Sequence, residues 1–166
     1  MLRERNLWRL TFWRWLLVIL WMALIFILSS QPKASMPHYP NGMLDWGIKK
    51  SAHMIEYGIL AILFWRAVSG CAGATVRRSQ VWLVPLFCLV YAATDEYHQS
   101  FVPGRSSSVW DVLVDGLGTL LTLTIVSLLL KLRARHLSGF FVHPWLTRFL
   151  DGFSPLRPVV QENLPE

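Results

Sequence analysis

Four apolar runs along the chain constrain its fold more than any other feature of the sequence. They cover residues 15–28, 57–65, 81–94 and 116–130. Each run is shorter than the roughly 20 residues that a helix needs to cross the hydrocarbon core of a membrane. Each reaches that length only together with polar residues at one end. We therefore expect four spans, over about residues 12–30, 50–68, 80–98 and 110–130.

The composition favours membrane spans over the core helices of a soluble protein. Hydrophobic residues make up 54% of the 166 residues and charged residues only 16%, whereas a soluble domain carries about 25% charged residues. The mean hydropathy is +0.40. So few charges cannot cover the surface of a globule. We expect an all-α protein, an integral membrane four-helix bundle.

The positive charge is distributed in a way that predicts topology. The net charge is +6, but the sequence has no basic stripe and no nucleic-acid-binding module, so we expect no nucleic-acid partner. Most Lys and Arg residues lie before the first run, between the second and third, or after the fourth. The exceptions are Lys33, Lys49, Lys50 and Arg105. Because Lys and Arg are enriched in cytoplasmic loops, we expect both termini in the cytoplasm.

The chain divides into a membrane domain and a tail. We assign residues 1–133 to the four-span domain and residues 134–166 to a cytoplasmic tail. The tail begins with an aromatic and basic stretch that Gly and Pro interrupt, which is typical of a short interfacial segment, and its last residues are expected to be disordered. A signal peptide is the alternative for the first run, but no Ala-x-Ala cleavage site follows it.

Two local features concern the fourth span. Residues 101–108, FVPGRSSS, predict a Pro–Gly turn followed by a helix start, with Ser107 or Ser108 as the N-cap. Helices in membranes approach closely at small residues, and we expect Gly116 and Gly118 to provide such contacts.

The polar residues that complete the spans share one side of the membrane. In the second span Lys49, His53 and Glu56 are spaced as on one face of a helix, and Asp111 and Asp115 are spaced likewise in the fourth. The predicted topology puts all of these residues at the outer ends of the spans. Ionisable residues inside a membrane indicate a functional site. Two structural alternatives remain: contact with water at the headgroups, and a salt-bridge network that locks the helices.

Several of these residues belong to a recognisable composite pattern. It consists of KKSAHMIEYGIL, TDEYHQSFVPGRSSSVWDVLVDGLG and the earlier LSSQP. The pattern resembles the VanZ-like family of small bacterial membrane proteins, which is named for a protein associated with teicoplanin resistance. The resemblance runs from about Ser29 to Gly118 and extends over the flanking helices. It implies a multi-pass protein of the bacterial inner (cytoplasmic) membrane, in the cell envelope.

The resemblance implies no defined reaction, so three functions stay open. The first is binding of a lipid-linked or cell-wall headgroup, with a link to glycopeptide (teicoplanin) resistance. The second is a membrane-embedded hydrolase or transferase that acts on a polyprenyl-phosphate type of substrate. The third is a small transporter or assembly factor. Because four spans are few for a transporter, the third function requires a homo-oligomer.

Residue chemistry divides the polar residues into two candidate groups. A histidine can act as general base, and Lys and Arg can hold phosphate. The catalytic candidates are His53, Glu56, Asp95, Glu96 and Asp111. The binding candidates are Gln31, Lys49, Lys50, His98, Gln99, Arg105 and Asp115. The spacing of His53 and Glu56 is weak evidence for a metal, so we expect no metal site, and the sequence leaves any cofactor unknown.

Overall fold

The computed structural model describes residues 2–32, 34, 40–71 and 78–136. These residues form four helices and no strand, which confirms the predicted all-helical class. The helices are α1 (Leu2–Ser29), α2 (Gly42–Cys71), α3 (Arg78–Gln99) and α4 (Val109–His136). Each helix extends beyond its apolar run, because the polar residues at the run's ends continue the helical backbone. Most of the predicted tail, residues 137–166, lies outside the described residues.

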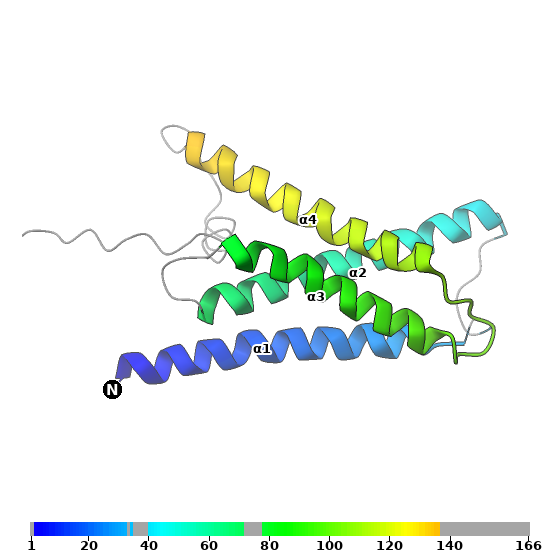
Figure 1. Cartoon of the computed structure of the whole chain (residues 1–166), viewed down its shortest axis with the longest axis horizontal. Helices are drawn as coiled ribbons and strands as arrows, with labels where there is room; N and C mark the ends of the chain where they lie inside the picture. The colour runs from blue at the N-terminus through cyan, green and yellow to red at the C-terminus, as the bar shows by residue number, and fades with distance from the viewer. Residues whose placement is uncertain (1, 33, 35–39, 72–77, 137–166) are drawn as a thin grey trace, which may run out of the picture.

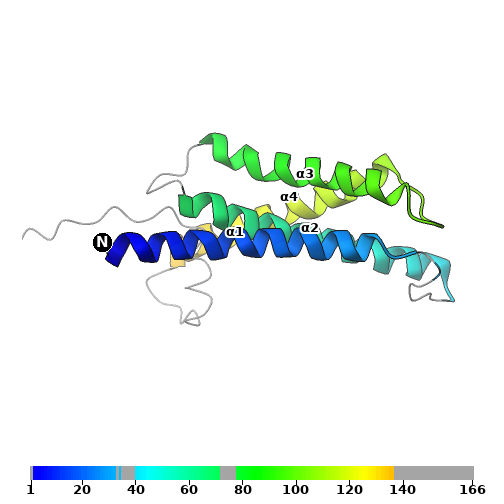
Figure 2. The ribbon, with the colours of Figure 1, turned by 90° about the horizontal axis from the view of Figure 1, so that it is seen from below.

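Successive helices run in opposite directions along the long axis of the molecule (Figure 1). The start of α1 and the end of α4 lie at the same end in both side views (Figures 1 and 2). We call this end the basic end, because Arg9, Arg14 and Arg66 lie toward it. The opposite end, where α1 and α3 finish and α2 and α4 begin, is called the polar end. Helix α2 contacts each of the other three helices.

Glycines set the close approach of α2 and α4. A Cβ on Gly118 would lie 2.5 Å from the carbonyl oxygen of Met54, so the two backbones meet there. Gly58 of α2 is in similar contact with Thr122 of α4. The predicted contact at Gly118 is therefore confirmed. Gly116 faces the other neighbour instead, since its Cβ would lie 3.4 Å from Leu89 of α3.

The apolar core lies between α1, α2 and α3. It includes Ile25, Leu60 and Cys88, which are all buried, and the rings of Phe64 and Phe87 stack with their centres 3.9 Å apart. Two side chains tie the helices together through backbone carbonyls. Trp21 Nε1 donates to the Glu56 carbonyl at 2.9 Å. Tyr91 Oη donates to the Met22 carbonyl at 2.6 Å.

Among the described residues, two helices contain segments long and apolar enough to cross a membrane, Trp8–Ser29 of α1 and Val109–Leu129 of α4. Only 11% of the apolar window in α1 and 22% of that in α4 is buried inside the molecule. A core helix of a soluble protein buries its apolar face, and large exposed apolar surfaces mark contact with a membrane or a partner. The outer surface of this protein is therefore apolar over much of its length.

Candidate functional site

A cavity of about 640 Å³ lies at the polar end, and all four helices contribute to its lining. The end of α1, the first half of α2, the end of α3, the α3–α4 turn and the start of α4 surround it. Its charged or titratable lining residues are Asp45, Lys49, Lys50, His53, Glu56, Arg105 and Asp111. Three cations and three carboxylates thus meet in one space, together with a histidine.

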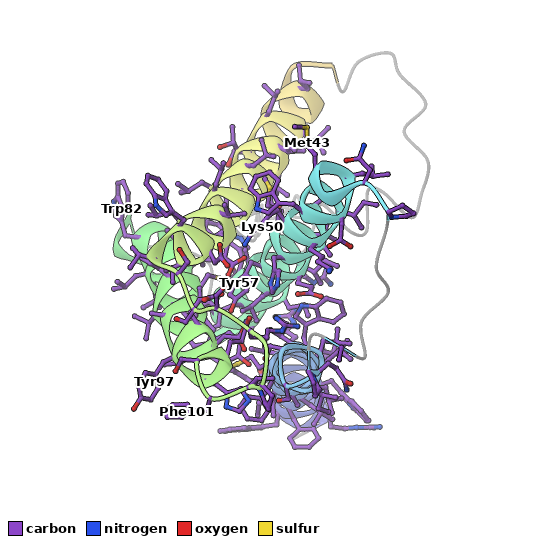
Figure 3. The ribbon with its side chains drawn as sticks, turned by 90° about the vertical axis from the view of Figure 1, so that its right-hand side faces the viewer. Met43, Lys50, Tyr57, Trp82, Tyr97 and Phe101 are labelled. Carbon is purple, nitrogen blue, oxygen red and sulfur yellow. The ribbon has the colours of Figure 1, made fainter. Side chains whose placement is uncertain are left out.

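Two ion pairs organise one wall of this cavity. Lys49 Nζ lies 2.7 Å from Asp45 Oδ2, one turn away on α2. Lys50 forms a salt bridge with Asp111 and so joins α2 to α4. Lys50 and Tyr57 lie between the helices when the molecule is viewed from the polar end, whereas Trp82 and Tyr97 point outward (Figure 3). The lysines are therefore held in place but keep partly exposed side chains.

His53 lies between two carboxylates. Its Nδ1 atom is 3.6 Å from Glu56 Oε2 and 3.9 Å from Asp115 Oδ1. Both distances exceed a hydrogen bond, and neither His53 Nδ1 nor Asp115 Oδ1 has a hydrogen-bond partner. His53 lines the cavity, although its Nδ1 atom is buried.

Unpartnered polar atoms continue below His53 along the α2–α4 contact. Asp115 is only 2% exposed, and Tyr57 and Thr119, each one helical turn further on, are fully buried. The hydroxyl groups of Tyr57 and Thr119 also have no hydrogen-bond partner. Buried polar groups are normally paired, and these unpartnered atoms form a polar seam between α2 and α4.

Asp95 has a different role from the cavity carboxylates. It is 3% exposed and does not line the cavity. Ser29 Oγ donates to its Oδ1 at 2.6 Å, and Gln99 Nε2 donates to its Oδ2 at 2.8 Å. Both carboxylate oxygens are therefore occupied, and Asp95 joins the end of α1 to the end of α3.

Arg105 extends this network to the cavity. Its Nη1 donates to Gln99 Oε1 at 2.6 Å, and its Nε donates to the carbonyl of Gln31 at 3.3 Å. The preceding Gly104 has a φ of 76°, a left-handed conformation that favours glycine. The predicted Pro–Gly turn thus places the guanidinium against the end of α1, at the cavity wall.

Glu96 and His98 also make contacts that hold the helices and the α3–α4 turn together. Glu96 Oε2 accepts the backbone N–H of Ser108 at 3.0 Å. Ser108 Oγ in turn accepts the N–H of Trp110 at 3.2 Å, which confirms Ser108 as the N-cap. His98 Nε2 lies 3.0 Å from Ser30 Oγ, and its ring stacks on Phe26 with centroids 4.2 Å apart.

The structure brings eight of the twelve predicted residues to the cavity lining. They are Gln31, Lys49, Lys50, His53, Glu56, Gln99, Arg105 and Asp111. Asp95, Glu96, His98 and Asp115 lie behind the wall. Sequence reasoning missed Asp45, Trp46 and Ser106, which also line the cavity. Asp45 had a usable signal, since it precedes Lys49 by one turn on the same helix face.

The side chains of the cavity offer cations, carboxylates and a histidine. Within residues 2–32, 34, 40–71 and 78–136, no group of three or more His, Cys, Asp or Glu side chains is arranged to hold a metal ion. Cations can bind phosphate, carboxylates can accept hydrogen bonds from hydroxyl or amino groups, and His53 can exchange a proton.

These features define a small all-helical protein with candidate membrane-crossing helices and a charged cavity at one end. The VanZ/LLP1 family model matches residues 12–130, which include all residues of the cavity. The chain belongs to this family, as the resemblance of its motifs predicted. No curated protein and no solved structure matches the chain.

Proposed function

We propose that this chain is a multi-pass protein of the bacterial cytoplasmic membrane, and that all four helices cross the bilayer. The Trp8–Ser29 segment has 22 residues, which is roughly 33 Å at 1.5 Å per residue. This length matches the hydrocarbon thickness of about 30 Å. The carboxylates of α2 and α3 then lie inside the helical assembly or at its polar end, where other protein groups satisfy them.

Exposed aromatic residues at both ends of the molecule support this placement. Trp8 and Trp82 are 76% and 74% exposed toward the basic end. Trp46 and Trp110 are 62% and 75% exposed at the polar end. Trp and Tyr are enriched where a membrane meets water, so these two levels correspond to the two interfaces. Because the Arg-rich end belongs in the cytoplasm, the cavity opens to the outer face.

We propose that the cavity binds the polar headgroup of a lipid-linked or cell-wall molecule at this outer face. The observation that carries the proposal is the joint lining of Lys49, Lys50 and Arg105 with Asp45, Glu56 and Asp111. A volume of about 640 Å³ falls within the range of about 300–1,000 Å³ for small-molecule sites. A headgroup that is bound in this cavity would be less accessible to a glycopeptide such as teicoplanin.

Binding of headgroups to the purified full chain tests this proposal. We expect the Arg105→Gln variant to weaken the binding of an anionic headgroup by roughly tenfold, about 1.4 kcal/mol. Arg9→Gln, at an exposed position of the basic end, is the matched control and should leave binding unchanged. Equal binding by wild type and Arg105→Gln would refute the proposal. Teicoplanin susceptibility of cells with each variant then tests the link to resistance.

A second candidate function, hydrolysis or group transfer, is favoured by one observation. His53 lies between Glu56 and Asp115 and lines the cavity. A carboxylate beside one ring nitrogen orients a histidine so that the other nitrogen can accept a proton from a nucleophile. Incubation of the protein with polyprenyl-phosphate-linked substrates distinguishes the two functions. Binding without any product would exclude the catalytic one.

A further inference from the structure

We propose that the ligand is a lipid with a glycosyl-phosphate type of headgroup, and that its hydrocarbon chain leaves the cavity sideways between α1 and α2. This inference rests on the proposed binding function and refines it. The ligand is then an amphiphile that enters from the membrane, not a water-soluble fragment that enters from the outside solution.

The charges of the cavity carry the headgroup part of the inference. Lys50, which is paired with Asp111, and Arg105, which donates to Gln99, bring two cations to the cavity, and a phosphate is bound by such cations. Asp45 and Glu56, on the same wall of α2, supply acceptors that repel a bare anion but bind hydroxyl groups. Behind them, the buried Asp115 oxygen has no hydrogen-bond partner. A headgroup that carries both phosphate and hydroxyl groups uses the two kinds of side chain together.

The apolar residues of the lining support the inference about the hydrocarbon chain of the lipid. Leu28 of α1 and Trp46 of α2 line the cavity and are nevertheless 42% and 62% exposed. Ala52, also in the lining, is exposed as well. Lining residues that also lie on the outer surface mark where the cavity opens. Leu28, Trp46 and Ala52 mark an opening at the side, and Gln31, Gly104 and Ser106 mark a second one at the polar end. Helices α1 and α2 diverge toward the polar end (Figure 1).

The outer surface beside the opening is suited to a hydrocarbon chain. Leu24 lies one turn before Leu28 on α1 and is 40% exposed. On α2, Ile48 and Ile55 share the helix face of Ala52 and are 41% and 62% exposed. A lipid chain that leaves the charged cavity here passes directly onto apolar side chains at the level of the membrane.

The test compares two probes that share one headgroup, polyprenyl phosphoryl glucose and glucose 1-phosphate. Their binding is measured on the full chain in nanodiscs or detergent, by native mass spectrometry or thermophoresis. We expect the long-chain probe to bind at least roughly tenfold more tightly, because its chain is buried against the protein. Equal affinity for the two probes would overturn the sideways exit while leaving the proposed headgroup binding intact.

Variants at the side opening test where the hydrocarbon chain of the lipid leaves the cavity. Ala52→Trp narrows the opening and should reduce binding of the long-chain probe by roughly tenfold, with glucose 1-phosphate binding unchanged. Leu28→Trp narrows it from the opposite side and should have the same effect if Ala52→Trp does not fold. Ala93→Trp, the same substitution at an exposed position of α3, should change neither affinity.

Each other outcome has a defined meaning. If the folded opening variants leave the long-chain affinity unchanged, or reduce both affinities equally, the chain does not leave between α1 and α2, and the inference is overturned. If neither probe binds the wild type, or Lys50→Gln and Arg105→Gln leave both affinities unchanged, the proposed headgroup site itself fails. The two failures are thereby distinguishable.

Discussion

Asp115 Oδ1 lies 3.9 Å from His53 Nδ1, and neither atom has a hydrogen-bond partner. The two residues come from α4 and α2, and Asp115 is almost completely buried. A buried carboxylate without full hydrogen bonding lowers stability. Because Asp115 lies directly behind the wall of a charged cavity, we predict that it acts on His53 and does not support the fold.

The Asp115→Asn variant separates these two roles. Asn has the same shape without the charge, so we expect the free energy of unfolding to stay within about 1 kcal/mol of wild type, or to rise. Any product formation from a bound substrate should fall, because the neutral amide no longer stabilises a protonated His53. Thermal unfolding in detergent and a product assay measure the two effects. A clear loss of stability would identify Asp115 as a structural residue.

Gly118→Ala tests the close contact of α2 and α4. The added Cβ would lie 2.5 Å from the Met54 carbonyl oxygen, so the helices must separate, and we expect a loss of about 1–3 kcal/mol in unfolding free energy. Gly47→Ala is the control, since its Cβ would have no atom within 4 Å. In that helix position Ala should raise stability by about 0.5–1 kcal/mol. Equal melting temperatures for the two variants would contradict the packing.

Asp95→Ala should act on stability and not on chemistry. The change leaves Ser29 and Gln99 without their acceptor in a buried place, which costs about 1–3 kcal/mol. Ser29→Ala removes one donor only and should cost less. Circular dichroism melts of both variants check this order. Full stability of Asp95→Ala combined with lost ligand binding would instead make Asp95 a direct site residue.

Labelling from outside the cell tests the proposed orientation. In a chain with Cys71→Ser, we expect Ser106→Cys, beside the cavity, to react with a membrane-impermeant maleimide in intact cells. Arg9→Cys, at the basic end, should react only after the membrane is permeabilised. The remaining Cys88 is buried and should not react in the folded protein. Reaction of Arg9→Cys alone in intact cells would reverse the topology.

Sequence periodicity was sufficient to predict the four helices and the residues of α2 that line the cavity. The four apolar runs identify the four helices because the helical repeat is a local property. The same repeat brings Lys49, His53 and Glu56 onto one face of α2, and all three line the cavity. The Pro–Gly turn and a serine cap at Ser107 or Ser108 were also predictable, because each depends on a few adjacent residues.

Only the tertiary structure determined which carboxylates hold the helices together and which one lines the cavity. In the sequence Asp95, Glu96 and Asp111 are equivalent acidic residues at the ends of apolar runs. In the fold the first two satisfy Ser29, Gln99 and the backbone of Ser108, whereas Asp111 pairs with Lys50 at the cavity. Such assignments depend on how the helices are rotated against one another. That rotation follows from contacts between distant residues, such as Gly118 with Met54, which no local pattern contains.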